Sequence, residues 1–158
     1  FIADVENVAT LEAAARETTL AVSHVDATLA IDVDRDLLFS ALANLLNNAF
    51  KFTSHRTEVR LNAYAAADRI LIEVSDSCGG LPAGANERMF LPFTQGSGDR
   101  SGLGLGLSIS RRSVEANGGI LRVRDVPGTG CVFTIDLPRH LLPGAGPATA
   151  ANQENLAV

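Results

Sequence analysis

The sequence is poor in several residue types and patterns that mark particular classes of protein. It contains two cysteines, one methionine, one tyrosine and no tryptophan. Cys78 and Cys131 lie far apart and outside any Cys-x-x-Cys or Cys/His cluster, so their spacing argues against zinc and signals no disulfide, and we expect buried free thiols. No apolar run approaches 18 residues, and the first residues lack the basic start of a signal peptide. We therefore expect a soluble, cytoplasmic segment without membrane contact, even if its parent protein is membrane-anchored.

Positive charge is also scarce. The 13 Lys and Arg residues are outnumbered by 18 Asp and Glu residues, which gives a formal net charge of −5. Proteins that bind a nucleic-acid backbone usually carry a basic patch, so no nucleic-acid partner is expected and any bound anion must be held by local groups. With 158 residues, 46% of them hydrophobic, the chain is long enough for one domain that buries roughly 70% of its unfolded surface.

Hydrophobic periodicity predicts helices and strands in a mixed order. Apolar residues at Val8, Leu11, Ala14 and Ala15 suit a first helix, and Asp34 is placed to cap a second. Alternating runs bounded by turn residues predict the strands. The helices are expected at 8–18, 34–53 and 107–117, and the strands at 19–23, 28–33, 57–65, 69–75, 120–124 and 131–137. The fold class that follows is α+β, a two-layer α/β sandwich with helices packed on one face of a mixed sheet.

The segment Asn44-Leu-Leu-Asn-Asn-Ala-Phe-Lys-Phe-Thr53 puts polar residues into a helix that otherwise looks buried. At about 100° per residue, Asn44, Asn48 and Lys51 fall within an arc of roughly 60°, opposite a stripe of leucines. Unpaired buried polar groups cost roughly 1–3 kcal/mol each. This polar stripe therefore needs a polar ligand, water or open solvent, and taken alone it fits a solvated surface equally well.

Residues 76–101 form a long irregular stretch, of the kind that commonly serves as a lid, and a glycine-rich segment follows them. Gly102-Leu-Gly-Leu-Gly106 stands immediately before the predicted helix 107–117. Alternate glycines let the backbone approach a ligand closely, and a helix N-terminus offers unpaired amides and a positive dipole end. This pattern favours a phosphate site over a flexible linker, because the intervening leucines favour burial.

Asp76 begins the motif Asp-Ser-Cys-Gly-Gly directly after a predicted strand. A buried carboxylate that accepts a hydrogen bond from an exocyclic amine can select adenine, although an ordinary Asx turn is as good an interpretation of this motif alone. Lys51 and Arg100 could neutralise phosphate charge. Asn44 and Asn48 offer neutral oxygens to Mg²⁺, a hard ion that takes few protein ligands.

In this order, these motifs resemble the ATP-binding catalytic domain of two-component sensor histidine kinases, within the GHKL superfamily. The resemblance covers roughly residues 34–138. Residues 44–53 resemble the N box of that family, 76–80 its G1 box, 90–93 its F box and 102–106 its G2 box, and 128–130 resemble a short glycine turn near its end. Four or five motifs at proper spacing make the resemblance specific, unlike a lone Gly-x-Gly-x-Gly.

The resemblance implies a Bergerat-type ATP-binding fold, ATP and Mg²⁺ as ligands, and a role for each motif. Asn44 and Asn48 would serve Mg²⁺, Lys51 the phosphates and Asp76 the adenine amine, with Phe52 beside the adenine. Phe90 and Phe93 would anchor the lid, and Gln95 and Arg100 would approach the phosphates. The implied nucleotide-binding residues are Asn44, Asn48, Lys51, Phe52, Asp76, Gly80, Phe93, Arg100, Gly102, Leu103, Gly104, Leu105 and Gly106.

The resemblance also implies an organisation and partners. Residues 1–15 would be a residual linker from an upstream dimerisation and phosphoacceptor region, residues 16–140 the catalytic domain, and residues 141–158 a disordered tail. The γ-phosphate would pass to a histidine outside this segment and then to a downstream response regulator. His24, His55 and His140 lack the family's phosphoacceptor context, and we expect them to be structural or solvated. An anti-sigma-type serine kinase and a non-catalytic nucleotide-sensing module on the same fold stay open as alternatives.

Two positions depart from related patterns. Cys78 stands where the family has the first G1 glycine, and a cysteine there is strained if that position needs a positive φ. Ser40 stands where the wider superfamily has a glutamate that activates water, one turn before Asn44. A serine hydroxyl is too weakly basic for efficient proton abstraction at neutral pH, so the pattern disfavours ATP hydrolysis and leaves phosphotransfer open.

Overall fold

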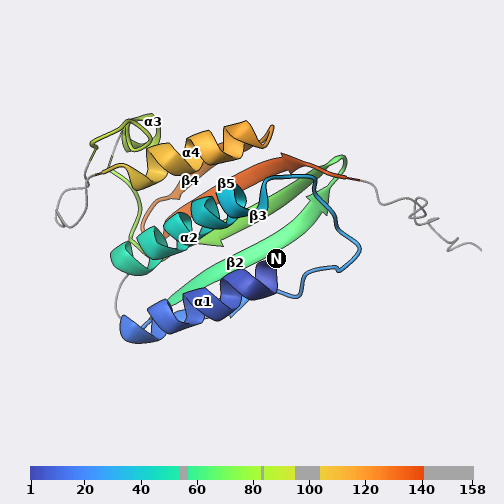
Figure 1. Ribbon diagram of the computed structural model, residues 1–158. Helices are drawn as coiled ribbons and strands as arrows, with labels where there is room; N and C mark the ends of the chain where they lie inside the picture. The colour runs from blue at the N-terminus through green and yellow to red at the C-terminus, as the bar shows by residue number, and fades with distance from the viewer. Residues whose placement is uncertain (54–56, 83, 95–103, 141–158) are drawn as a thin grey trace, which may run out of the picture.

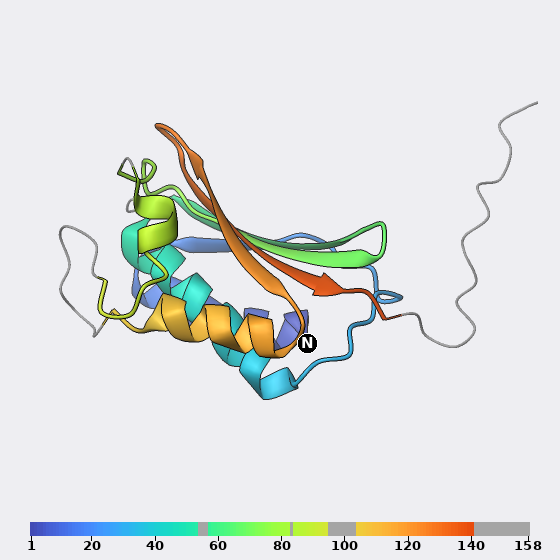
Figure 2. The same ribbon diagram turned by 90° about the horizontal axis from the view of Figure 1, so that it is seen from above.

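The computed structural model describes residues 1–53, 57–82, 84–94 and 104–140, which form a helical layer against a single sheet. The helices are α1 (Ile2–Ala15), α2 (Arg35–Phe52), α3 (Ala85–Arg88) and α4 (Gly106–Ala116), and the strands are β1 (Thr19–Val22), β2 (Glu58–Ala66), β3 (Arg69–Ser75), β4 (Ile120–Val126) and β5 (Gly130–Pro138). Figures 1 and 2 show α1, α2 and α4 along one face of the sheet. No helix in the described ranges is long and apolar enough to cross a membrane.

The sheet is mixed, and the predicted fold class is confirmed. Its strand order is β1-β2-β3-β5-β4, with β1 parallel to β2 and the other pairs antiparallel. The hairpin β2–β3 turns through Ala67, which has a φ of 55°. The hairpin β4–β5 brings β5 into the sheet beside β3, so the two strands next to each other at its centre come from distant parts of the chain.

The core lies between α2 and the sheet. Asp34 caps α2 as predicted, because its side chain accepts hydrogen bonds from the amides of Asp36 and Leu37. The predicted apolar stripe of α2 is fully buried, and it meets inward residues of β3 and β5. The fully buried members of this core in α2, β3 and β5 are Leu38, Ala41, Leu42, Leu45, Leu46, Ala49, Val74, Ile135 and Leu137.

Two local predictions were wrong. Residues 28–33 form no strand, and their one bridge in the described chain joins Ala30 to His140. A turn held by Asp26, whose carboxylate accepts from the amide and hydroxyl of Thr28, precedes this bridge. Alternating apolar residues predict a strand here, but residues 28–33 have no neighbouring strand among the described residues with which to pair.

The first helix begins earlier than predicted and packs through a different face. α1 runs over Ile2–Ala15, and Val5, Ala9 and Ala13 are its buried residues. Val8 and Leu11, on the predicted face, are 56% and 75% exposed, and they border a hollow of about 320 Å³ between α1 and α2. Small side chains at every fourth position let α1 pack closely on α2 and β1. The assignment of residues 1–15 to an upstream linker stays a prediction.

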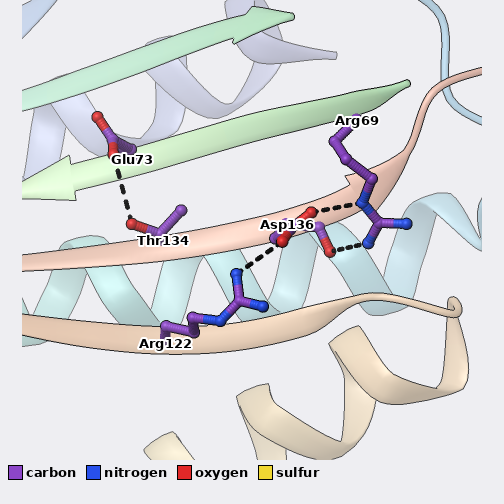
Figure 3. Close-up of polar contacts among 5 residues, drawn as sticks. All are labelled: Arg69, Glu73, Arg122, Thr134 and Asp136. Carbon is purple, nitrogen blue, oxygen red and sulfur yellow. Dashed lines mark hydrogen bonds and ion pairs between the residues drawn. The ribbon is translucent and has the colours of Figure 1, made fainter. Parts of the chain in front are cut away.

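An ion-pair network joins three strands on the face of the sheet opposite the helices (Figure 3). Asp136 of β5 accepts from Arg69 Nε of β3 through Oδ1 and from Arg122 Nη1 of β4 through Oδ2, each at 2.7 Å. Arg69 Nη2 also donates to the Asp136 carbonyl at 3.1 Å. Partial burial acts to raise the pKa of Asp136, but the hydrogen bonds from Arg69 and Arg122 outweigh it, and the net pKa lies below the ordinary carboxyl value.

We predict that Asp136→Asn lowers the free energy of unfolding by about 1–2 kcal/mol at pH 7, because the arginines lose a charged acceptor while staying partly solvated. The folded state lowers the pKa of Asp136, so this stabilisation is complete above the unfolded-state pKa and disappears as pH falls through the folded-state pKa. Urea unfolding at pH 7 and pH 3 measures the difference, with exposed Asp32→Asn as the control. A destabilisation of equal size at both pH values would contradict the account.

Candidate functional site

The end of α2, the end of β3, α3 and the start of α4 lie at the same end of the sheet (Figure 1). Asp76 follows β3 there and is 8% exposed. Its Oδ1 accepts from the Cys78 amide at 3.1 Å and the Cys131 amide at 2.9 Å, and its own amide donates to the Cys131 carbonyl at 3.0 Å. The carboxylate thus takes the place of the next carbonyl in the β3–β5 ladder. Because neither bond uses Oδ2, the backbone fixes the carboxylate through one oxygen.

This arrangement requires a glycine on the neighbouring strand. A Cβ added to Gly130 would lie 2.0 Å from the Asp76 carbonyl oxygen and 2.8 Å from its Oδ1. Contacts this short are not tolerated, so only a glycine lets β5 approach Asp76 so closely. The turn before Gly130 is tied to the turn after Asp76, since the Gly79 amide donates to the Thr129 carbonyl and the Gly128 amide to the Gly79 carbonyl.

Cys78 fits the turn after β3 without the strain considered from the sequence. The positive φ values in this turn fall on Gly79, at 88°, and Gly80, at 102°. Cys78 itself is not among the residues with a positive φ. The substitution of a glycine by Cys78 therefore places no side chain in a left-handed conformation, and the two following glycines absorb the turn.

Thr53 joins the end of α2 to the Asp76 turn. Its Oγ1 accepts from the Ser77 amide at 2.9 Å, which holds the last turn of α2 beside the residue that follows Asp76. Phe52 is 44% exposed next to this joint, and the Lys51 ammonium lies 5.2 Å from the centre of its ring. Thr53 ends the segment 44–53, but the sequence pattern predicts no role for it, because a contact over 24 positions leaves no local signal.

The polar stripe of α2 meets the first turn of α4. Asn44, Asn48 and Lys51 are all partly exposed. A Cβ added to Gly106 would lie 4.0 Å from Asn44 Cγ. Elsewhere in the interface Ser110 Oγ, which donates to the Gly106 carbonyl at 2.9 Å, lies 3.4 Å from the Ala41 carbonyl oxygen. The structure thus brings Asn44 next to Gly106, the last residue of the glycine-rich segment 102–106. The α4 N-terminus at Leu105 has no side-chain cap, so its amides can receive an anion.

The two ends of the segment between residues 94 and 104 are joined at the base of the site. The Phe93 amide donates to the Gly104 carbonyl at 3.0 Å. Gly104 has a φ of 66°, and a Cβ there would lie 2.6 Å from the Thr94 carbonyl oxygen, so this approach also requires glycine. The predicted site residues Arg100, Gly102 and Leu103, and the predicted lid residue Gln95, lie outside the described residues. The structure leaves their predicted roles as predictions.

The two phenylalanines of segment 90–93, which resembles the F box, differ in their surroundings. Phe90 is 4% exposed, with the Arg111 guanidinium 3.9 Å from its ring centre, as suits an anchor. Phe93 is 75% exposed, and its backbone has a φ of 64°. The contact with Gly104 therefore holds the backbone of Phe93 and leaves its ring exposed. Phe93 therefore presents an exposed ring beside the site.

Taken together, one end of the fold carries a largely buried carboxylate fixed by the backbone, two amide side chains, an ammonium and an uncapped helix N-terminus. A carboxylate oxygen accepts a hydrogen bond from an amine, whereas the ammonium and the helix amides attract anions. Such a surface suits a ligand with an amino group at one end and charged oxygens at the other.

The chain also matches a protein family. The model of the family described as "Histidine kinase-, DNA gyrase B-, and HSP90-like ATPase" matches residues 33–141. The sensor protein KdpD of Mycobacterium tuberculosis is 43% identical over 107 residues, which cover 66% of this chain and 12% of that relative. The chain therefore spans only about an eighth of the length of this relative.

Two solved structures match the fold. A structure of full-length ShkA in complex with AMPPNP has a TM-score of 0.77 and 29% identity, and the match covers 88% of this chain and 29% of that one. A nucleotide-free catalytic domain of the histidine kinase ThkA has a TM-score of 0.77 and 23% identity, covering 87% of this chain and 89% of that one. The second match shows the fold alone.

Proposed function

We propose that this chain transfers the γ-phosphate of Mg-ATP to a histidine outside residues 1–158. The chain belongs to the family of histidine kinase-, DNA gyrase B-, and HSP90-like ATPases, and it is a catalytic ATP-binding domain of the sensor histidine kinase type. The observation that carries the proposal is the Asp76 carboxylate, fixed by two backbone amides through Oδ1. Family membership identifies ATP as the ligand class, and the residues around Asp76 supply the chemistry.

Asp76 selects adenine through its second oxygen. With Oδ1 occupied by two amides, Oδ2 accepts from the exocyclic amine of adenine. Guanine presents a carbonyl at that position, which would face a carboxylate oxygen and lose a hydrogen bond. The partly exposed ring of Phe52 next to the Thr53 joint provides an apolar surface for the base.

Asn44 and Asn48 hold the metal side of the nucleotide. Their partly exposed amides lie on one stripe of α2, with Asn44 beside Gly106, so these two residues would hold Mg²⁺ through neutral oxygens. When bound, Mg²⁺ neutralises phosphate charge. Lys51 and the first amides of α4 bind the phosphate oxygens, and the family resemblance supports the same role for Arg100, which lies outside the described residues.

Ser40 favours transfer over hydrolysis. It is exposed one turn before Asn44 on α2, where a general base would have to take a proton from water. A hydroxyl is a poor general base at neutral pH. The imidazole of a phosphoacceptor histidine is itself a competent nucleophile and needs no base, so phosphotransfer to such a residue remains efficient.

The proposed partners follow from this direction of transfer. A dimerisation and phosphoacceptor region of the parent protein would supply the histidine, and a response regulator would receive the phosphoryl group. Relatives named as a sensor protein and as a signal transduction histidine-protein kinase support a role in two-component signalling, and we propose that the reaction takes place on the cytoplasmic side. The labelling experiment below distinguishes this function from that of a serine kinase or a nucleotide-sensing module.

We predict that Asp76→Asn weakens ATP binding at least tenfold, about 1.4 kcal/mol, because a neutral amide at this position replaces a charged acceptor. Titration calorimetry with ATP and GTP measures the affinity and the base preference. Asp68→Asn, at the other end of β3 on an exposed turn, is the matched control and keeps the wild-type affinity. Unchanged ATP affinity in Asp76→Asn would remove Asp76 from the site.

We predict that the chain labels a histidine hairpin when mixed with γ-labelled ATP, Mg²⁺ and phosphoacceptor hairpins of sensor histidine kinases. The label is expected to be acid-labile and base-stable, as phosphohistidine is. An acid-stable label would favour the serine kinase. ATP binding without any label on the hairpins would favour the nucleotide-sensing module, and ATP consumption without a hairpin would contradict the role given to Ser40.

A further inference from the structure

Folding brings the two cysteines of the chain together. Cys78 Sγ and Cys131 Sγ lie 3.2 Å apart, although the residues are 53 positions apart in sequence. Both are free thiols in the structure. Cys131 is 2% exposed on β5, and Cys78 is partly exposed in the turn after β3. The expectation of buried free thiols is confirmed for Cys131, whereas Cys78 is free but partly exposed, and the contact between the two sulfurs was not predicted from the sequence.

The same two residues hold the carboxylate of the proposed nucleotide site. The amides of Cys78 and Cys131 are the two donors to Asp76 Oδ1. The two sulfurs and a carboxylate oxygen of Asp76 all lie within 4.8 Å of one another. A bond between the two sulfurs would therefore affect both of the amides that donate to Asp76 Oδ1.

We propose that Cys78 and Cys131 form a reversible disulfide with a low-molecular-weight disulfide as oxidant, and that this bond lowers the affinity of the site for ATP. The second half of this inference rests on the proposed function of Asp76. The first half rests on the contact between the sulfurs.

The disulfide between Cys78 and Cys131 forms by two successive thiol–disulfide exchange steps. The thiolate of Cys78, the accessible residue, attacks one sulfur of the oxidant, which expels one thiolate and leaves a mixed disulfide on Cys78. The Cys131 thiolate then attacks Cys78 Sγ and expels the second thiolate. The chain loses two electrons and two protons, and the oxidant leaves as two thiols. Burial raises the pKa of both cysteine thiols, so the exchange is slow at neutral pH and accelerates as pH rises.

The bond would disturb the carboxylate because it shortens a contact. A disulfide has a sulfur-sulfur distance of about 2.05 Å, so the sulfurs must approach by about 1.2 Å from their present 3.2 Å. This draws the turn at residues 77–80 towards β5 and shifts the amides that fix Oδ1. Hydrogen bonds to a charged acceptor weaken with such displacement, and the orientation of Oδ2 changes with them. By linkage, bound ATP must favour the reduced thiols by the same factor.

The experiment uses the 158-residue chain in mixtures of reduced and oxidised glutathione at pH 8, with a chelator present to keep metals from the thiols. Alkylation and intact mass count the free thiols, and titration calorimetry gives the ATP affinity of each form. We expect the oxidised chain to lose two mass units, retain no glutathione, and bind ATP at least fivefold more weakly, with full recovery under dithiothreitol. Circular dichroism shows that the oxidised chain stays folded.

The control is Cys78→Ala, which cannot form the bond, so glutathione disulfide must leave its ATP affinity at its own untreated value. Cys131→Ala serves as the second control, with glutathione retained on Cys78 as the expected product. Two free thiols in the oxidised wild type, or a disulfide with unchanged ATP affinity, overturns the inference. If the reduced chain fails to bind ATP, the proposed function falls and the coupling with it, while the mass measurement alone still decides whether the bond forms.

Discussion

The structure depends on the close approach of β5 to Asp76, where a carboxylate continues a strand ladder in place of a carbonyl. The approach is possible because Gly130 has no Cβ, which would lie 2.0 Å from the Asp76 carbonyl oxygen. Two backbone amides then fix Oδ1. A binding group held by the sheet itself loses little conformational freedom when a ligand arrives, and this preorganisation favours affinity.

Contacts near Asp76 also position the helices of the site. Thr53 fastens the end of α2 to the residue after Asp76, which sets the position of Lys51 and Phe52, and the packing of α2 on α4 brings Asn44 to the first turn of α4. The buried leucines of α2 hold this helix on the sheet. Thus the core that stabilises the fold and the stripe that would bind Mg-ATP are two faces of one helix.

Local features of the sequence were sufficient for most of the fold. The Asp34 cap, the leucine stripe of α2 and the β2–β3 hairpin are set by neighbours in the chain, and the family resemblance drawn from the motifs is confirmed by the match over residues 33–141. The failures are non-local. The packing face of α1 depends on α2, residues 28–33 lack a strand partner, and the contact of Cys78 with Cys131 arises only when β5 joins β3. The roles of Arg100, Gly102 and Leu103 stay predictions from the resemblance.

The central claim is that the Asp76 turn and the α2 stripe hold opposite ends of one nucleotide. A crystal structure of this chain with a non-hydrolysable ATP analogue and Mg²⁺ tests it most directly. We expect the adenine amine about 3 Å from Asp76 Oδ2 and the metal about 2.1 Å from amide oxygens of Asn44 and Asn48. A nucleotide bound elsewhere, for example in the hollow between α1 and α2, or a base that makes no contact with Asp76, would contradict it.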